Sequence, residues 1–341
     1  MPELMSSREL RDLISPIPRV SLGQFPTPLE FCPRLSEAVG GPRIFIKRDD
    51  STGLAFGGNK TRILEFTVGQ AVAHGADVVI GGAGSQSNHC RQLAAAAAKL
   101  GLDCALVLVN DHMGEQIQGN RLLIDLLGAS VEMVEVESQE LLTDAKKDLH
   151  DRLRADGRTP FIVMRPETRP FGAMGFALCL AEIADQLAEM GKKVDRLVVC
   201  SGSTTQPGLM FGNKMMGLGI GIVGVTPMVW SYDLKEAFLG VLSRTVEELG
   251  ADVSFSSDEI VNLDGYIGPD GYGYPSDEGN EALRLMATME GVLLDPIYSA
   301  KALAGLIDLS RKGTIGREET VIFLHTGGTP AVFAYSKELG I

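Results

Sequence analysis

Residues 77–101 read DVVIGGAGSQSNHCRQLAAAAAKLG, and this stretch decides the fold that the sequence predicts. An apolar run of strand length, DVVIGG, passes through small and polar residues into a segment with the composition of a helix. The same arrangement recurs along the chain, with apolar runs CALVLV (104–109), VEMVEV (131–136), FIVMRP (161–166), VDRLVVC (194–200), GIGIVGVT (219–226) and ETVIFLH (319–325). Repeated strand, loop and helix units predict an α/β fold with mostly parallel sheets covered on both faces.

Length and composition limit the possible classes of protein. A chain of 341 residues with 45% apolar and 22% charged residues is long enough for two domains. Its formal net charge of -13 argues against a nucleic-acid or anionic membrane partner, because lysine and arginine bind such surfaces. No stretch approaches an uncharged span of about 20 residues, and the amino terminus lacks the pattern of a signal peptide. The 5 cysteines lack the close pairs of a metal or redox site, which predicts a reduced, cytoplasmic protein without a metal.

Three loops that follow predicted strands are the candidates for chemistry, since ligands bind at the carboxyl ends of parallel strands. Residues 81–92, GGAGSQSNHCRQ, combine small residues with Ser87 or Asn88 as a helix cap. Residues 201–209, SGSTTQPGL, are rich in hydroxyls and glycine and would cradle a phosphate at the start of a helix. Residues 325–331, HTGGTPA, offer the Thr326 hydroxyl and two glycines that would admit a flat ligand.

A fourth loop carries a lysine on glycine-rich backbone. GLAFGGNKT, residues 53–61, approaches the pattern of a nucleotide-binding loop, but Asn59 stands where that pattern requires glycine. A nucleoside triphosphatase is therefore excluded. The alternative is that Lys60 forms an imine, and an imine-forming amine beside a separate phosphate cradle predicts pyridoxal 5'-phosphate as cofactor.

Several of these segments together resemble one family, the D-cysteine desulfhydrases and 1-aminocyclopropane-1-carboxylate deaminases. These are pyridoxal phosphate enzymes of fold type II, which are similar to the tryptophan synthase β subunit. The resemblance extends from PRVSLGQFPTPLEF to the carboxyl terminus and rests on IFIKRDDSTGLAFGGNKTRILEF, GSQSNHCRQLAAAAAKLGL, SGSTTQPGL, DEGNEALRLMATMEGVLLDPIYSAKALAGLI and FLHTGGTPAVFAY. It implies two three-layer α/β domains, a larger one of residues 1–59 plus 166–341 and a smaller inserted one of residues 60–165. It also implies a homodimer with its active site in the cleft between the domains.

The resemblance also implies roles for individual residues. Lys60 would link to the cofactor and move the α-proton. The other implied catalytic residues are Ser87, Tyr298 and Tyr272. The implied cofactor-binding residues are Lys60, Asn88, Ser203, Thr204, Thr205, Gln206, Tyr298 and Thr326. The implied substrate-binding residues are Ser87, Gln86 and His89.

The reaction that the resemblance implies is an α,β-elimination from a β-substituted amino acid, such as D-cysteine or L-cysteate, to pyruvate, ammonia and the leaving group. The cyclopropane deaminases of the family typically have glutamate after the cofactor tyrosine and leucine in the late glycine loop. Here Ser299 and Thr326 stand there, which favours the desulfhydrase branch. The cyclopropane deaminase remains the alternative within the enzymes, ahead of a β-replacement synthase or a racemase. A pyridoxal-phosphate-binding protein without catalytic activity is the alternative outside them.

Residues 164–176, MRPETRPFGAMGF, depart from the family pattern by placing Arg165, Glu167 and Arg169 in a turn. These charges would suit a salt-bridged surface turn. Alternatively, Arg165 or Arg169 would bind an anionic side chain of the substrate through paired hydrogen bonds. The second interpretation predicts that cysteate is preferred over D-cysteine.

Overall fold

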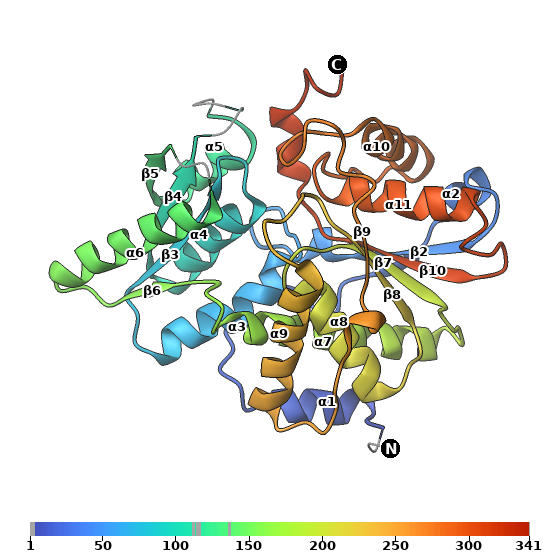
Figure 1. Ribbon diagram of the computed structural model, residues 1–341, viewed down its shortest axis with the longest axis horizontal. Coiled ribbons are helices and arrows are strands. Elements are labelled where there is room, and N and C mark those ends of the chain that lie inside the picture. The colour runs from blue at the N-terminus through green and yellow to red at the C-terminus, as the bar shows by residue number, and fades with distance from the viewer. Residues whose placement is uncertain (1–3, 111–112, 114–116, 136–137, 341) are drawn as a thin grey trace.

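The computed structural model describes residues 4–110, 113, 117–135 and 138–340, which form two sheets with helices on both faces (Figure 1). The larger sheet has six strands in the order β1-β2-β10-β7-β8-β9. Only β1 is antiparallel to its neighbour. The strands are β1 Leu29–Phe31, β2 Arg43–Arg48, β7 Arg196–Cys200, β8 Gly221–Val225, β9 Val261–Leu263 and β10 Thr320–His325.

The smaller sheet has four parallel strands in the order β5-β4-β3-β6. Its register is fixed at the centre, where Ile80 pairs with Ala105 on one side and with Ile162 on the other. The strands are β3 Val78–Gly84, β4 Asp103–Val109, β5 Ser130–Val134 and β6 Pro160–Ile162. Parallel order brings the ends of β3 and β4 to the same edge of the sheet.

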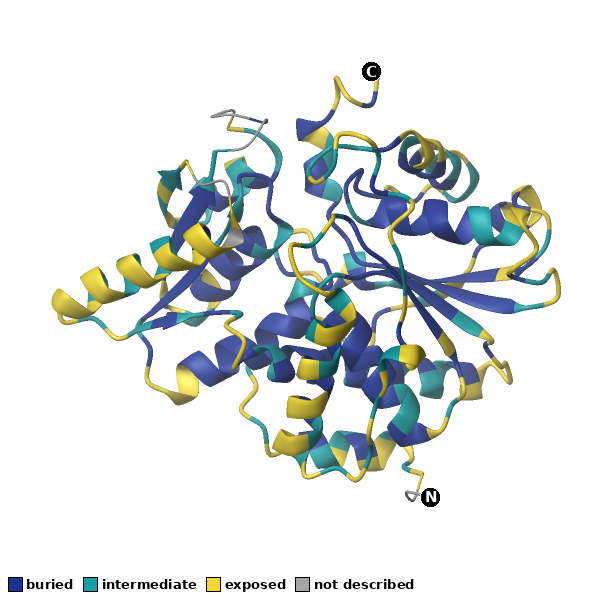
Figure 2. Cartoon of the chain, viewed as in Figure 1, coloured by how far each residue is buried: buried dark blue, intermediate teal, exposed yellow. Residues whose placement is uncertain are grey.

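Helices cover both faces of the larger sheet, because successive strand residues point to opposite sides. Val198 packs into one hydrophobic core and its neighbour Val199 into the other. Figure 2 shows the central strands of this sheet mostly in the colour of buried residues. One face is covered by α2 Pro33–Ala38, α10 Asp277–Glu290 and α11 Ser299–Arg311, and the other by α1 Ser7–Ile14, α7 Arg169–Glu189, α8 Thr205–Met216 and α9 Leu234–Leu249.

The smaller sheet is covered in the same way. Its main core lies against α3 Lys60–Ala73, α4 Asn88–Leu100 and α5 Gly119–Leu126. On the opposite face, Leu149 and Leu153 of α6 Gln139–Ala155 pack against Val78 and Ile80. The outer face of α6 is exposed to solvent (Figure 2).

A buried ionic network joins α3 to the larger sheet. Arg62 of α3 pairs with Asp49 at 2.7 Å and with Glu182 of α7 at 2.8 Å. Lys47 of β2, which has no exposed side-chain surface, lies 3.0 Å from the same glutamate. Burial opposes ionisation of Glu182, but the two cations hold its pKa below the usual value. Arg62 is therefore committed to this network.

The predicted fold class, an α/β protein with mostly parallel sheets, is confirmed. Every apolar run named above contains a strand, although the boundaries differ. The run 161–166 ends as a strand at Ile162, because the backbone turns at Met164, whose φ is 65°. After β10 the chain forms a 3-10 helix, Thr329–Ala334. Between β4 and β5, residues 111–112 and 114–116 lie outside the described residues, and the helix that follows them begins at Gly119.

The predicted division into domains lies close to the boundary between the two sheets. Strands of the smaller sheet occupy residues 78–162, within the predicted inserted domain of residues 60–165. However, α3 packs against α7 of the larger sheet as well as against α4. The exact division, 1–59 with 166–341 against 60–165, stays a prediction.

One described helix, α7, is long and apolar enough to cross a membrane by these two criteria. Within the apolar window of α7, 67% is buried inside the protein. Its buried residues face α3, α8 and the larger sheet, as expected of a central core helix.

Candidate active site

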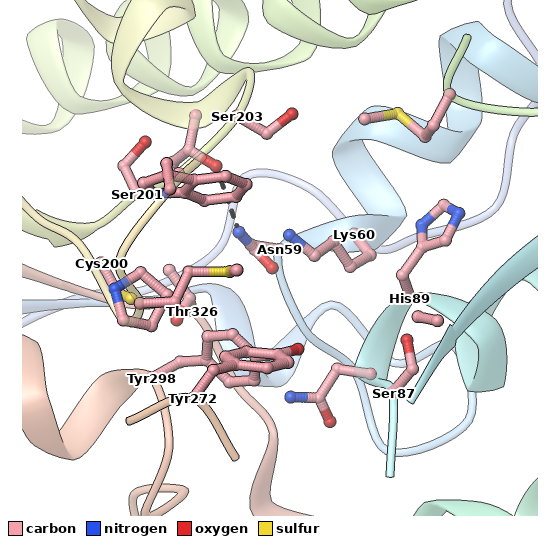
Figure 3. A pocket seen from close by; sticks show the side chains of 18 of the residues that line it. Asn59, Lys60, Ser87, His89, Cys200, Ser201, Ser203, Tyr272, Tyr298 and Thr326 are labelled. Carbon is pink, nitrogen blue, oxygen red and sulfur yellow. Dashed lines mark hydrogen bonds between the residues drawn. The ribbon is translucent and has the colours of Figure 1, made fainter. Parts of the chain in front are cut away.

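Lys60 begins α3 at the end of a loop with an unusual backbone. Gly57 and Gly58 have φ values of 68° and 127°, and a Cβ atom at Gly57 would lie 1.9 Å from the Asp50 carbonyl oxygen. Only glycine fits there, so the glycines are required by the backbone path. The Asn59 amide donates to the Thr326 carbonyl oxygen at 2.9 Å. This loop directs Lys60 into a cavity between the two sheets (Figure 3).

The amine of Lys60 lies in an environment that disfavours its charged form. Burial lowers its pKa, while Cys200 and Asp295 act in the opposite direction. Among the residues that the structure describes, no carboxylate forms an ion pair with Lys60. A lysine with a lowered pKa can serve as a base or a nucleophile near neutral pH.

The start of α4 forms the wall opposite the larger sheet. Ser87 caps this helix by accepting a hydrogen bond from the Cys90 amide at 3.2 Å, and its hydroxyl borders the cavity. Asn88 also borders the cavity, where its Oδ1 accepts from Asn120 Nδ2 at 2.7 Å. The first amides of a helix favour an anion, which suits a carboxylate here.

His89 is the third residue of this wall. Burial first, and then the charges of Lys60 and Lys146, lower its pKa to about 3. The imidazole is therefore neutral at physiological pH. It can donate or accept a hydrogen bond, but it supplies no charge to an anionic ligand.

Gln86 is placed differently from the prediction of a substrate-binding side chain. Its Oε1 accepts from the Asn120 amide at 2.9 Å, and its Nε2 donates to the Gln118 carbonyl oxygen at 3.1 Å. Gln86 is not among the residues that line the cavity in the described part of the chain. The side chain instead fixes the α5 region against the start of α4.

The loop between β7 and α8 forms the wall on the side of the larger sheet. Ser203 and Thr205 border the cavity. Thr204 is buried, and its hydroxyl lacks a hydrogen-bond partner among the described residues. Figure 3 shows Lys60 between this serine-rich loop and the start of α4. Hydroxyls and amides at a helix start form a site for a phosphate.

Gln206 follows directly but points elsewhere. Its Oε1 accepts from Asn262 Nδ2 at 2.8 Å, and its Nε2 donates to the Val261 carbonyl oxygen at 2.7 Å. Its side chain therefore holds β9 in place. The predicted role of Gln206 in binding the cofactor has no support from its side-chain contacts.

Two tyrosines and a threonine complete the predicted set. The hydroxyls of Tyr272 and Tyr298 are 2.5 Å apart, and both rings line the cavity. Burial, followed by the influence of Tyr272, raises the pKa of Tyr298. Its hydroxyl therefore keeps its proton. Thr326 borders the cavity at the end of β10.

The two arginines of the charged turn occupy different environments. Arg169 borders the cavity, and its Nε is buried without a partner among the described residues. Arg165 is exposed, outside the cavity lining, with its guanidinium 5.3 Å from the centre of the Phe161 ring. The described residues that line the cavity include no aspartate or glutamate. The cavity therefore presents positive charge without an acidic residue on its walls.

Other residues line the cavity without having been predicted. The loop after β8 also lies at a strand end, where ligands bind, but its apolar and aromatic residues carry no recognisable ligand motif. Asn59 was visible only as an interruption of a nucleotide-binding pattern. The unpredicted lining residues are Asn59, Ala83, Met164, Cys200, Ser201, Gly202, Pro227, Met228, Trp230 and Tyr232.

The site fits pyridoxal phosphate by its own chemistry. Lys60 supplies the amine that an aldehyde requires. The Ser203 and Thr205 hydroxyls, which border the cavity, and the start of α8 supply donors for a phosphate. The Trp230 ring packs so closely on Gly202 that a Cβ atom there would lie 2.3 Å from Trp230 Cζ2, so this loop admits only a bare backbone.

These features define an enzyme that holds its cofactor through a lysine and a hydroxyl-rich helix start. Residues 20–327 match the family model of pyridoxal-phosphate dependent enzymes. The chain belongs to this family. The predicted family and the predicted cofactor, pyridoxal 5'-phosphate, are confirmed.

The comparisons also identify particular relatives. D-cysteine desulfhydrases of Salmonella choleraesuis (strain SC-B67) and Salmonella paratyphi C (strain RKS4594) are 42% and 41% identical over 336 residues. Each alignment covers 93% of this chain and 96% of the relative. A crystal structure of an ACC deaminase homologue is 34% identical, with a TM-score of 0.88 over 97% of this chain and 98% of that chain.

Proposed function

We propose that this protein is a pyridoxal-phosphate-dependent lyase that removes the β-substituent of a small amino acid by α,β-elimination. The products are pyruvate, ammonia and the leaving group, which is sulfide when the substrate is D-cysteine. The observation that carries this proposal is the position of Lys60, whose amine faces both a hydroxyl-rich phosphate cradle and the start of α4. The similarity to D-cysteine desulfhydrases over nearly the whole chain supports the leaving group.

The larger-sheet side of the cavity would hold the cofactor. Ser203 and Thr205 would donate to its phosphate, together with the first amides of α8, and Thr204 would contribute through the backbone of this loop. Asn88 and Thr326 would orient its ring from opposite walls. When bound, the cofactor supplies an aldehyde for the substrate amine and a sink for the electrons released at the α-carbon.

The remaining residues would bind the substrate and move protons. Ser87 and the start of α4 would hold the substrate carboxylate, with neutral His89 beside them. Lys60 would accept the α-proton at Nζ, because its lowered pKa leaves part of the amine unprotonated. Tyr298 keeps its proton and would donate it to the departing sulfur, with Tyr272 holding the hydroxyl in place. Water then completes the release of pyruvate and ammonia.

The test uses the purified full-length protein with its cofactor. Pyruvate and sulfide release is measured with D-cysteine and L-cysteine, and pyruvate release with D- and L-cysteate and 3-chloroalanine. Ring-opening of the cyclopropane amino acid is assayed in parallel. We expect turnover of at least one β-substituted substrate, and its loss in Lys60→Ala. Turnover of the cyclopropane alone would favour the deaminase alternative, and a bound cofactor without any turnover would favour the non-catalytic one.

Ser299 bears on the cyclopropane deaminase alternative. Its hydroxyl donates to Asp295 Oδ1 at 2.6 Å, and its side chain is fully buried outside the cavity lining. A hydroxyl committed in this way is not available to a substrate. This arrangement supports elimination over ring opening.

A second candidate substrate class is favoured by Arg169. Its unpartnered Nε and the absence of lining carboxylates would suit a β-substituent that is itself anionic, such as the sulfonate of cysteate. We expect Arg169→Met to raise KM for cysteate at least tenfold and to change KM for D-cysteine by less than twofold. Arg165→Met is the matched control, since its guanidinium lies outside the cavity. Loss of cofactor from Arg169→Met would instead assign this arginine to the phosphate.

The assembly and location follow from the family resemblance. We infer a homodimer in the cytoplasm, acting on a small amino acid. All 5 cysteines are free and buried, in keeping with a reducing environment. Light scattering of the purified protein at several concentrations tests the dimer, and a monomer at all concentrations would contradict it.

A further inference from the structure

Arg91 is a fully buried cation that the proposed chemistry does not use. It lies on α4, one turn after Ser87, and its side chain has no exposed surface. Burial lowers its pKa to about 10, with Asp295 acting in the opposite direction. The guanidinium therefore remains charged at neutral pH. Among the described residues it forms no ion pair, and its Nε has no hydrogen-bond partner.

The two terminal nitrogens of Arg91 hold the loop that leads to Lys60. One donates to the Ala55 carbonyl oxygen, and the other donates to the Gly57 carbonyl oxygen at 3.0 Å. The planar guanidinium carries two donors in a fixed fork, which neither lysine nor methionine reproduces. An isolated buried charge costs several kcal/mol in general, so a purely space-filling role would be served better by an apolar side chain.

The loop needs this support, because its backbone is strained. Ala55 and Phe56 have φ values of 42° and 69°, and the two glycines that follow also have positive φ. A non-glycine residue in this conformation is strained and persists only where the surrounding structure holds it. The Phe56 side chain is 68% exposed, so burial of the aromatic ring does not hold the loop. The hydrogen bonds from Arg91 offset the strain.

The same helix therefore controls two sides of the cavity. Its first residues, Ser87 and His89, face Lys60 across the cavity (Figure 3). Its next turn carries Arg91, which fixes the backbone just before that lysine. Gln92, the following residue, accepts a hydrogen bond from Thr61 Oγ1 at 2.8 Å, immediately after the lysine. Arg91 and Gln92 thus contact the chain on both sides of Lys60, at Gly57 and at Thr61, and fix its backbone relative to α4.

We propose that Arg91 is a positioning residue, which acts through the Ala55 and Gly57 carbonyl groups to keep the Lys60 amine in the cavity. This inference rests on the proposed role of Lys60. It assigns a buried side chain, outside the cavity lining, to the reactivity of that lysine. The loop would relax without the guanidinium, and Lys60 would sample positions outside the cavity.

The test uses full-length Arg91→Met and Arg91→Lys, with Lys99→Met as the matched control. Lys99 lies on the same helix and donates to the Leu22 carbonyl oxygen at 2.9 Å, so its removal also deletes a cation that binds a loop carbonyl. Thermal unfolding first establishes that each variant is folded. Two readouts follow on the folded variants: chymotrypsin cleavage after Phe56, and the rate at which added pyridoxal phosphate is trapped on Lys60 by borohydride in cofactor-stripped protein.

We expect Arg91→Met to be cleaved after Phe56 at least tenfold faster than the parent protein and to label Lys60 at least tenfold more slowly. Arg91→Lys should lie between, and Lys99→Met should match the parent. Faster cleavage with unchanged labelling would make Arg91 merely structural and overturn the inference, as would unchanged cleavage. If Arg91→Met does not fold, the same readouts on Arg91→Lys decide. Labelling of the parent protein at a residue other than Lys60 would instead overturn the proposed function.

Discussion

The hydroxyls of Tyr272 and Tyr298 lie 2.5 Å apart and form one hydrogen-bonded pair at the cavity. Tyr272 is 40% exposed, whereas Tyr298 lies deeper. The pair therefore connects the cavity to the long loop between β9 and α10.

Removal of the Tyr298 hydroxyl should lower turnover more than removal of the Tyr272 hydroxyl. We expect Tyr298→Phe to lower kcat by about 100-fold, as for the loss of a general acid, and Tyr272→Phe to lower it less. Tyr272→Phe should also lower the pKa of Tyr298, because Tyr272 contributes to raising it. Titration of tyrosine absorbance at alkaline pH measures this shift. The signal that is absent from Tyr298→Phe belongs to Tyr298. Tyr266→Phe, which removes a hydrogen bond to Asp308 away from the cavity, is the control. Equal losses of kcat in both cavity variants would contradict the assigned roles.

His89 should make the folded protein lose stability in mild acid. The pKa of His89 in the folded protein, about 3, lies below the ordinary histidine value of 6.5, so between these values the unfolded chain binds more protons. The contribution of His89 to stability is thus present above pH 6.5 and decreases as the pH falls towards 3. It should decrease by about 2 kcal/mol between pH 7 and pH 5. Urea unfolding of His89→Gln should show a smaller loss over this interval, and an identical pH dependence would disprove the depressed pKa.

Arg62 should be worth much more to stability than an exposed arginine. Arg62→Met leaves Asp49 and Glu182 buried with less compensating charge, which should lower the free energy of unfolding by about 3–5 kcal/mol. Arg196→Met removes a pair with Glu319 at 2.6 Å that is partly exposed, and should cost about 1 kcal/mol or less. Urea denaturation of both variants measures the difference. Equal costs would show that the buried network contributes no more than a surface pair.

Trp230 provides an optical report on the cavity, because it is the one tryptophan in the sequence. Gly202→Ala should displace its ring, since the new Cβ would lie 2.3 Å from Trp230 Cζ2. We expect a red-shifted emission and at least tenfold weaker retention of pyridoxal phosphate, because the loop between β7 and α8 must move. Gly240→Ala is the control, since a Cβ there meets no atom within 4 Å. Unchanged emission in Gly202→Ala would contradict the packing of Trp230 on this loop.

Sequence reasoning identified the parts of the site that depend on position at strand ends. Ser87, Ser203, Thr205 and Thr326 follow buried strands, and the parallel order of each sheet brings such residues to a common edge. The close packing of the backbone before Lys60 could also be predicted, because glycines allow neighbouring backbone segments to approach each other. The residue roles remain predictions, but the structure brings these side chains to one cavity.

Side-chain direction could not be predicted in the same way. Gln86 and Gln206 belong to the correct loops, but their amides bind Asn120 and Asn262, which are distant in sequence. Arg165 and Arg169 belong to one charged segment. Arg169 lines the cavity because α7 begins at this residue, whereas Arg165 precedes the helix and lies outside the lining. Such choices depend on long-range packing that a local pattern does not contain.

The cavity lies between two sheets, and residues from both form its walls. Substitutions that change its shape can therefore be distinguished from substitutions that remove the cofactor site. Exchanges at Met164 or Tyr232 would alter the shape of the cavity wall without replacing Lys60 or any residue of the loop between β7 and α8. The product of a duplicated gene could thus acquire a new substrate while it still binds pyridoxal phosphate. Divergence in this family should accumulate at those positions sooner than at Lys60.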